Sequence, residues 1–553
     1  MTKLSVIADG KEIELISEEE KRFKLYELAE MVSENHKGFI TAAKINNKLF
    51  DLSEEVDDGD DIEFLDTLNE DGDRIYFRVL SLVFVIACRK IFEKIKLSAE
   101  HSISDGIYYT LDIGRDLTNN DVEKIKEKMK RIVENDCVIK KVEMNKSEAA
   151  SIFRVLGRDE KAELIEMRDQ ETAKIYECEG YITHFYGMML PSTGFVKTFD
   201  IVKYKKGLVL MGPSENDKNI PEKFKDVPKL SKIYDESESW SQSLGVENVR
   251  DVNAIIESGQ YGDMVRTVEA LHEKKISQIA DMIKEKGSRV VLIAAPSSSG
   301  KTSFAHRLAI QLKVNGLISR PLSIDDYFIE RDKTPLDENG EHDFESLHSV
   351  DVELFNRDIN KLLNGEEIEI IRYDFKTGKR VHTGEKISVL ENQILIIEGI
   401  HGLNPELTRD IPSEEKFKIY ISAITQLNLD PLNRIPTTDL RLIRRIVRDS
   451  NFRGYSASDT IKGWKKVRNG EKKNIFPYQE EADVMFNSAC VYEISVLKKY
   501  AYNLLREVER NSPEYIEAAR LISFMQYFDT LDDIADIPPT AIIREFIGGS
   551  RIV

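Results

Sequence analysis

Residues 295–302, Ala-Pro-Ser-Ser-Ser-Gly-Lys-Thr, have the residue types and spacing of a phosphate-binding loop. They follow the pattern G-x-x-x-x-G-K-[ST], with Ala295 in place of the first glycine. The apolar run 290–294 before them predicts a buried parallel strand, and residues 304–312 after them predict an amphipathic helix. A loop between two such elements directs backbone N–H groups at phosphate oxygens, and the helix adds the positive end of its dipole.

This loop predicts binding of ATP with Mg²⁺. We expect Lys301 to bridge the β- and γ-phosphates and the Thr302 hydroxyl to ligate the metal. The alternative is a polar strand-to-helix turn in which Thr302 only caps the helix. The residues predicted to contact the nucleotide phosphates are Ala295, Pro296, Ser297, Ser298, Ser299, Gly300, Lys301, Thr302 and Ser303.

Two acidic positions follow apolar runs that predict further strands. Glu398 ends the run 393–398, where a parallel sheet would bring it beside the phosphate-binding loop to hold Mg²⁺ directly or through water. Asp325 follows the run that begins at Leu322, and a carboxylate there is suited to deprotonate an acceptor hydroxyl. The alternatives are a solvated strand end for Glu398 and a cap or turn for Asp325 and its neighbour Asp326.

Arginines recur at helical spacing further along the chain. Arg441, Arg444, Arg445 and Arg448 stand at i, i+3, i+4 and i+7, which is one face of a helix. Such a stripe predicts an anionic partner, and transferring phosphate oxygens fit. The alternative is a solvated face whose charges pair with nearby aspartates.

The length of 553 residues predicts several domains, and we expect a multidomain α/β protein in which one domain positions these residues. Alternating strand and helix patterns predict a parallel sheet flanked by helices over 286–500. Before it, short alternating runs with one helical segment predict a β-grasp-like unit over 1–68. We expect an α+β unit over 69–215, a helical connector over 216–285 and a C-terminal helical extension over 501–553.

Composition excludes several other classes of protein. The net charge of −19 makes a polyanion an unfavourable partner for the chain as a whole, although a local basic patch remains compatible with it. The four cysteines show no CxxC pairing, which favours a reducing compartment such as the cytoplasm. The longest apolar run, 79–88, is half of what a membrane helix needs, and acidic residues near the N-terminus argue against a signal peptide.

The segment from about 290 to 500 resembles the uridine kinase and phosphoribulokinase family. The phosphate-binding loop resembles that family's GGSxSGKT, residues 373–375 its YDF element, and 439–454 its arginine-bearing lid. The resemblance implies that Asp325 is the general base, that Glu398 and Thr302 hold Mg²⁺, and that Arg453 closes over the phosphates. It implies catalytic roles for Asp325, Lys301, Arg445 and Arg448, and acceptor binding by Glu345, Tyr373, Asp374, Arg380 and Arg445.

The sequence departs from that family on the acceptor side. Glu345 replaces the ribose-binding aspartate, and Gly378 replaces a histidine that contacts the base. In the lid, Tyr455 replaces an arginine, and Gly463 stands near the place of a base-reading glutamine. The resemblance therefore keeps the phosphate chemistry and leaves the acceptor as a small molecule with a hydroxyl group.

The N-terminal half resembles the front of threonyl-tRNA synthetase. Residues 42–65 resemble its TGS domain, while 101–109 and 190–194 resemble its second additional domain, the editing module. That module's metal ligands fall on a helix without histidine and on Phe185 and Met189, which cannot ligate zinc. The adjacent His184 is interpreted as a structural histidine, so we expect a binding or regulatory module without editing activity.

Two functions follow from these patterns. The first is an ATP-dependent small-molecule kinase, nucleoside kinase-like, that phosphorylates a hydroxyl of a ribose-containing or related acceptor. The alternative is a nucleotide-regulated switch factor that binds RNA or the ribosome through its N-terminal modules. Both are compatible with an oligomer, and neither involves a membrane.

Overall fold

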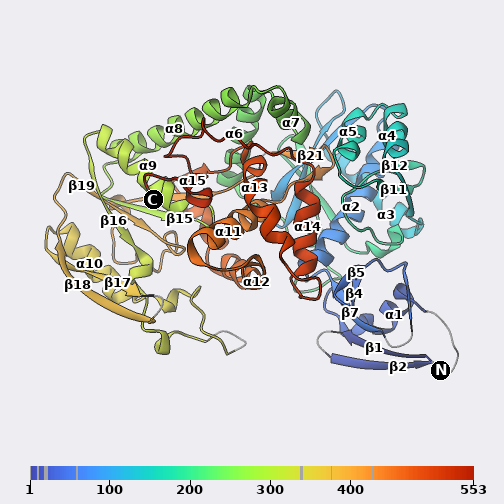
Figure 1. Ribbon diagram of the computed structural model, residues 1–553, viewed down its shortest axis with the longest axis horizontal. Coiled ribbons are helices and arrows are strands. Elements are labelled where there is room, and N and C mark those ends of the chain that lie inside the picture. Colours follow the sequence, from blue (N-terminus) through green and yellow to red (C-terminus); the bar gives the residue numbers. More distant parts are fainter. Residues whose placement is uncertain are drawn as a thin grey trace.

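The computed structural model describes residues 2–8, 11–17, 23–57, 60–336, 340–374, 377–425 and 427–553 (Figure 1). Phe375, part of the predicted YDF element, lies outside these residues. Within the described ranges, no helix combines the length and the apolar character that crossing a bilayer requires.

The N-terminal unit is a five-stranded mixed sheet in the order β2-β1-β7-β4-β5. Helix α1 buries Leu25, Leu28, Ala29 and Val32 in one core with the sheet residues, as expected for an amphipathic helix on a β-grasp-like sheet. Its elements are β1 (Thr2–Ala8), β2 (Lys11–Ser17), β3 (Phe23–Lys24), α1 (Leu25–Val32), β4 (Ile40–Ile45), β5 (Lys48–Phe50), β6 (Glu55–Val56) and β7 (Asp61–Asp66).

The second unit is built around α2 (Glu70–Ile91), whose apolar run 79–88 is buried in the same core as the first unit. A four-stranded sheet, β13-β14-β9-β8, and a three-stranded sheet, β10-β11-β12, belong to this unit. Its other elements are β8 (Lys96–Ile103), β9 (Gly106–Asp112), α3 (Asn119–Glu134), β10 (Lys140–Asn145), α4 (Lys146–Val155), α5 (Asp159–Glu166), β11 (Thr172–Cys178), β12 (Tyr181–Thr183), β13 (Asp200–Tyr204) and β14 (Gly207–Met211).

Three helices connect this unit to the C-terminal half: α6 (Pro228–Leu244), α7 (Val249–Glu257) and α8 (Tyr261–Lys286). The apolar stripe of α8, which includes Ile276, Ile279 and Ile283, joins the core of the following domain. The connector is therefore packed on that domain along its length, as Figure 1 shows for α8 and α9.

The C-terminal half contains a five-stranded parallel sheet in the order β16-β19-β15-β20-β23. All five residues of β15 are buried, as the continuous apolar run predicted. Its elements are β15 (Val290–Ala294), α9 (Lys301–Val314), β16 (Ile318–Ser323), α10 (Val352–Leu363), β17 (Ile368–Asp374), β18 (Lys379–Ile387), β19 (Gln393–Glu398), β20 (Lys416–Ser422), β21 (Asn428–Asp430), β22 (Asn433–Arg434), α11 (Thr437–Arg453), α12 (Ala457–Asn474), β23 (Val484–Asn487) and α13 (Glu493–Arg506).

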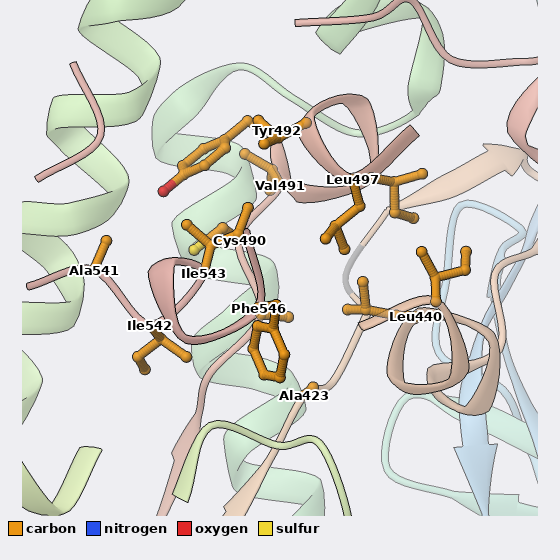
Figure 2. Close-up of a cluster of buried hydrophobic side chains, with 14 of the residues drawn as sticks. Ala423, Leu440, Cys490, Val491, Tyr492, Leu497, Ala541, Ile542, Ile543 and Phe546 are labelled. Atoms are coloured by element: carbon orange, nitrogen blue, oxygen red, sulfur yellow. The ribbon is translucent and has the colours of Figure 1, made fainter. Parts of the chain in front are cut away.

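The C-terminal segment folds back onto this domain. After α14 (Tyr515–Met525), the chain returns to the sheet and ends with the short helix α15 (Arg544–Ile547). Figure 2 shows Ile543 and Phe546 beside Cys490, and both side chains are buried in the core that surrounds β15. Apolar residues of the segment 541–547 are therefore part of the hydrophobic core of the domain that carries the phosphate-binding loop.

Candidate functional site

The phosphate-binding loop joins β15 to α9 at the carboxyl end of the parallel sheet. Ser298 and Gly300 have left-handed backbone, with φ of 61° and 76°. Gly300 has a second reason to lack a side chain, because an added Cβ would lie 2.3 Å from Cγ2 of Ile542. Helix α9 begins at Lys301, so its first N–H groups face the loop and form the anion-binding end of the helix.

Glu398 is the last residue of β19, and Asp325 lies in the short 3-10 helix (Ile324–Tyr327) that follows the adjacent parallel strand β16. The register pairs Ser323 of β16 with Glu398, and Ile293 of β15 pairs with Glu398 on the other side. The Glu398 carboxylate forms an ion pair with the Lys301 ammonium. The sheet therefore places the predicted metal ligand, base and loop lysine at one edge, as expected for the carboxyl ends of parallel strands.

The charges of this group perturb one another. Burial raises the pKa of Asp325 above its ordinary value, and the nearby Lys301 charge opposes that rise. Burial acts to lower the pKa of Lys301, but the carboxylates of Glu398 and Asp325 outweigh it, and the Lys301 pKa is raised. A lysine that stays charged and an aspartate of raised basicity suit phosphate binding and proton acceptance.

The predicted arginine stripe of α11 divides into two pairs with different partners. Arg441 and Arg444 are buried, with 1% and 0% of their surface exposed. Arg441 Nε donates to the Ser297 carbonyl at 2.9 Å, and Arg444 Nη1 donates to the Ser298 carbonyl at 3.2 Å. These two side chains support the phosphate-binding loop from behind, so they are not available to a transferring phosphate.

Each of these buried guanidinium groups has a buried glutamate partner. Glu471 of α12 pairs with Arg441, and Glu493 of α13 pairs with Arg444. Glu471 also accepts from the Ser297 N–H at 3.1 Å. Burial without such partners would leave uncompensated charges in the core, so the glutamates are what permit two arginines to lie there.

The remaining arginines of the lid surround one buried aspartate. Arg445, Arg448 and Arg453 lie 3.2, 3.0 and 3.6 Å from the Asp449 carboxylate. Arg445 Nη1 also donates to the Ser297 hydroxyl at 2.7 Å, which places this cluster against the phosphate-binding loop. Three guanidinium groups and one carboxylate leave two positive charges over, which is the excess that phosphate oxygens would neutralise.

Glu345, which is predicted to bind the acceptor, lies close enough to Asp325 and Arg445 for their charges to act on it. An added Cβ on Gly470 would lie 2.7 Å from the Glu345 Cγ, so the side chain fits closely against α12. Burial raises the pKa of Glu345 to about 7, the Glu471 charge adds to the rise, and Arg445 opposes it. Sequence reasoning found this residue only through the family resemblance.

The other predicted acceptor residues belong to the hairpin β17–β18. Arg380 donates to the Phe328 carbonyl at 3.1 Å and lies 3.2 Å from the Asp351 carboxylate. The Tyr373 ring packs against Phe328 with ring centroids 5.5 Å apart, and Asp374 accepts from the Thr377 hydroxyl at 2.9 Å. These contacts fasten the hairpin to the segment that follows Asp325, and acceptor binding by these residues stays a prediction.

Glu545 of α15 is a residue of this site that sequence reasoning missed. Its Oε2 accepts from the Ser303 N–H at 3.2 Å and from the Ser303 hydroxyl at 2.7 Å. The Glu545 charge also acts on Lys301 and Arg453. A carboxylate therefore holds N–H and O–H donors in the first turn of α9, where phosphate oxygens are expected. No local pattern signals it, because 242 residues separate the two partners.

The donor set fits a hard divalent cation. The Thr302 hydroxyl and the Glu398 carboxylate provide oxygen atoms, which Mg²⁺ prefers, and Asp325 lies close enough to act on the same charges. The Lys301–Glu398 ion pair shows that the carboxylate already faces a positive charge at this place.

Two positions expected to hold metal in the editing module carry buried apolar side chains. Phe185 and Met189 are 3% and 4% exposed and belong to the hydrophobic core. His184 Nδ1 is 2.8 Å from the Lys174 carbonyl, so this nitrogen carries the proton. These contacts agree with a structural role for His184.

The strand, the phosphate-binding loop and the helix, with Glu398 and Asp325 beside them, form the arrangement expected of a P-loop kinase domain. Residues 290–495 match the sequence model of the Phosphoribulokinase / Uridine kinase family. Among solved structures, one described as a possible uridine kinase from Bacillus stearothermophilus shares 17% identity and a TM-score of 0.26, covering 38% of this chain and 100% of that chain. At that TM-score the structural likeness adds no argument to the family match.

The N-terminal region matches threonine–tRNA ligases. The enzyme of Oceanobacillus iheyensis is 31% identical over 191 residues, which are 34% of this chain and 29% of the ligase. That of Caldanaerobacter subterraneus subsp. tengcongensis is 29% identical over 184 residues, 33% of this chain and 29% of the ligase. The chain thus spans less than a third of the length of these relatives.

Proposed function

We propose that this protein is an ATP-dependent kinase that transfers the γ-phosphoryl group to a hydroxyl of a ribose-containing or related small molecule. The observation that carries the proposal is the meeting of Asp325, Lys301 and Glu398 at one edge of the sheet, beside the arginine cluster around Asp449. A nucleotide-binding protein without catalysis has no need of a base at Asp325.

Each residue has a role in this reaction. Asp325 takes the proton of the acceptor hydroxyl, whose oxygen forms a bond to the γ-phosphorus as the bond to the β–γ bridging oxygen breaks and ADP leaves. Lys301, Arg445 and Arg448 neutralise charge on the phosphate oxygens as it develops. Mg²⁺, held by Thr302 and Glu398, would supply further charge neutralisation and fix the geometry of the phosphates.

Arg453 and Glu345 complete the site. Arg453 would close over the nucleotide phosphates from the end of α11. Glu345 would hold a hydroxyl of the acceptor, together with Tyr373, Asp374 and Arg380 of the neighbouring hairpin. The family match and the position of Glu345 against α12 support these roles.

The test is ATP consumption with a panel of nucleosides, pentose phosphates and pantothenate. We expect turnover with one class of acceptor, and its loss in Lys301→Ala and Asp325→Asn. Two exposed residues of the same types provide matched controls: Lys313 on α9, and Asp332, which follows Asp325 in the sequence. Lys313→Ala and Asp332→Asn should both keep the wild-type rate. Full activity in Lys301→Ala would refute the assignment of the loop.

The similarity to threonine–tRNA ligases supports the second candidate, a nucleotide-regulated factor that binds RNA or the ribosome. Under that function Asp325→Asn would keep its ATP turnover, and ATP would change the affinity for tRNA or ribosomes. A cytoplasmic location fits both candidates and is supported by the four free cysteines.

A further inference from the structure

A cavity of about 620 Å³ lies where the first unit, the second unit and the C-terminal half of the chain meet. It is distinct from a cavity of about 720 Å³ beside α10. The wall of the smaller cavity combines the first unit near β5, the second unit near α2 and β11, and α14 from the C-terminal half. Figure 1 shows α14 beside α2 and above β5. The volume is in the range of sites that hold small molecules.

Two guanidinium groups of this wall lack a carboxylate partner among the described residues. Arg78 of α2 donates to the Met188 carbonyl at 2.8 Å, and burial lowers its pKa. Gly187, with φ of 136°, lets the guanidinium approach, because a Cβ there would lie 2.5 Å from Arg78 Cζ. Arg168 is the second: its Nη2 donates to the Gln170 amide oxygen, and its Nε is buried without a hydrogen-bond partner.

None of the four acids of the wall forms an ion pair with Arg78 or Arg168 among the described residues. Asp51 and Glu54 pair with Lys141, while Asp71 pairs with Arg74 outside the cavity. The fourth acid, Glu143, accepts from the Thr172 hydroxyl at 2.6 Å. Arg520, a third arginine of the same wall, differs from these two because its charge is compensated by two carboxylates. Arg78 and Arg168 are therefore left for an anion from outside the chain.

Two neutral groups of the wall also lack partners. His184 Nδ1 donates to a carbonyl, so its buried Nε2 carries a lone pair and needs a donor. Burial lowers the pKa of His184 to about 4, so the ring stays neutral. The Tyr527 hydroxyl is also buried without a partner. A ligand group that reached these two atoms would have to be a donor for the imidazole and an acceptor for the phenol.

The aromatic side chains place these groups around a common surface. Arg78 lies over the Tyr186 ring at 6.0 Å, and Arg168 lies over the Tyr527 ring at 5.9 Å. The two rings meet edge to face with centroids 6.3 Å apart. Each guanidinium group thus lies over one ring of the pair, so positive charge and aromatic surface line the cavity together.

We propose that this cavity, lined by Arg78, Arg168, His184, Tyr186 and Tyr527, binds a small organic anion, a carboxylate or a phosphate ester, that also carries a hydroxyl or amino donor. The site is separate from the phosphate-binding loop. It does not depend on the proposed kinase reaction, because its residues come from the N-terminal units and from the segment that runs from α14 to Tyr527.

The test is isothermal titration calorimetry of the full chain with malate, ribose 5-phosphate and, as an uncharged probe, glycerol. We expect at least one anion to bind and glycerol not to bind. Arg78→Met and Arg168→Met keep the apolar stem and remove the charge, and each should weaken anion binding at least tenfold. Arg89→Met removes an exposed arginine of the same helix α2 and should change nothing.

Three results would overturn the proposal. The first is that neither anion binds the wild-type chain. The second is that both anion affinities survive Arg78→Met and Arg168→Met. The third is that Lys301→Ala abolishes anion binding, because the probe would then occupy the phosphate-binding loop. Thermal unfolding of each variant shows whether a loss of binding reflects a loss of fold, and ATP binding should be unchanged in both arginine variants.

Discussion

Glu545 should compete with the nucleotide for the first turn of α9. Its carboxylate accepts from both the N–H and the hydroxyl of Ser303. Phosphate oxygens of a bound nucleotide need the same donors, because the N-terminus of the helix is the anion-binding end. Ile543 and Phe546 are buried in the core, so the backbone of α15 stays in place and only the Glu545 side chain must leave. We predict that Glu545→Gln binds ATP more tightly than the wild-type chain.

The size of the effect follows from the contacts that ATP must replace. A hydrogen bond to a charged acceptor contributes about 1.5–3 kcal/mol. A carboxylate that stayed about 4 Å from one phosphate charge would add about 4 kcal/mol of repulsion at an effective dielectric of about 20, so the side chain should move away. Removing the charge at Glu545 should therefore add about 1.5–3 kcal/mol to the free energy of ATP binding. Since about 1.4 kcal/mol is a factor of ten, ATP should bind about 10 to 100 times more tightly.

The assay is titration calorimetry with ATP and Mg²⁺ on the wild type and Glu545→Gln. Asp536→Asn is the matched control, because Asp536 belongs to the same C-terminal segment and pairs with Arg266 at 2.7 Å, away from the phosphate-binding loop. Its affinity for ATP should equal that of the wild type. An unchanged affinity in Glu545→Gln would show that the carboxylate does not compete. A weaker affinity would show that Glu545 positions Ser303 for the nucleotide, which refutes the reasoning above.

Three further predictions follow from the same site. Burial raises the pKa of Asp325 above the ordinary 3.8, so the acceptor-dependent rate should already fall at a pH above 3.8 as the solution is acidified. A rate that does not change between neutral pH and pH 4 would contradict this. Burial raises the pKa of Glu345 from 4.5 to about 7, so the folded chain favours the protonated carboxyl. Ionised Glu345 therefore destabilises the fold increasingly as pH rises from 4.5 to about 7. Glu345→Gln should raise the free energy of unfolding at pH 8 by up to about 3 kcal/mol, seen as a higher unfolding temperature, and should leave it unchanged at pH 4. Replacing Arg444 by Met leaves Glu493 buried without its partner and should cost about 3–5 kcal/mol in thermal or denaturant unfolding, whereas the double variant with Glu493→Leu should recover part of that loss.

The local patterns predicted the centre of the fold well. The five consecutive apolar residues before the phosphate-binding loop predicted a buried strand, and β15 is one. The acids at Asp325 and Glu398 were found because strands in such a sheet end at one edge, which fixes where their last residues lie. The strand, the loop and the positions of the two acids depend only on short segments and on sheet geometry, so a single sequence is enough to predict them.

The arginines of α11 show where this kind of reasoning ends. Helical spacing places Arg441, Arg444 and Arg445 on one side of the helix, and it predicted a common phosphate-binding role. The structure separates them, because Glu471 and Glu493 approach from later helices and take the first two into the core. Periodicity reports which way a side chain points, whereas its role depends on what the rest of the chain brings to that face.

Glu545 extends the same argument to the whole site. Its segment carries no motif for phosphate chemistry, and the hydrophobic residues around it predict only a helix that packs somewhere. Those residues do pack: α15 lies against α11, its apolar side chains belong to the core that includes β15, and Ile542 lies against Gly300. The glycine that the loop needs for its backbone conformation is thus also the contact that brings the C-terminus to the nucleotide. A change that improves this packing should hold Glu545 closer to Ser303 and weaken ATP binding, so the stability of the C-terminal segment and the affinity for nucleotide are expected to oppose each other.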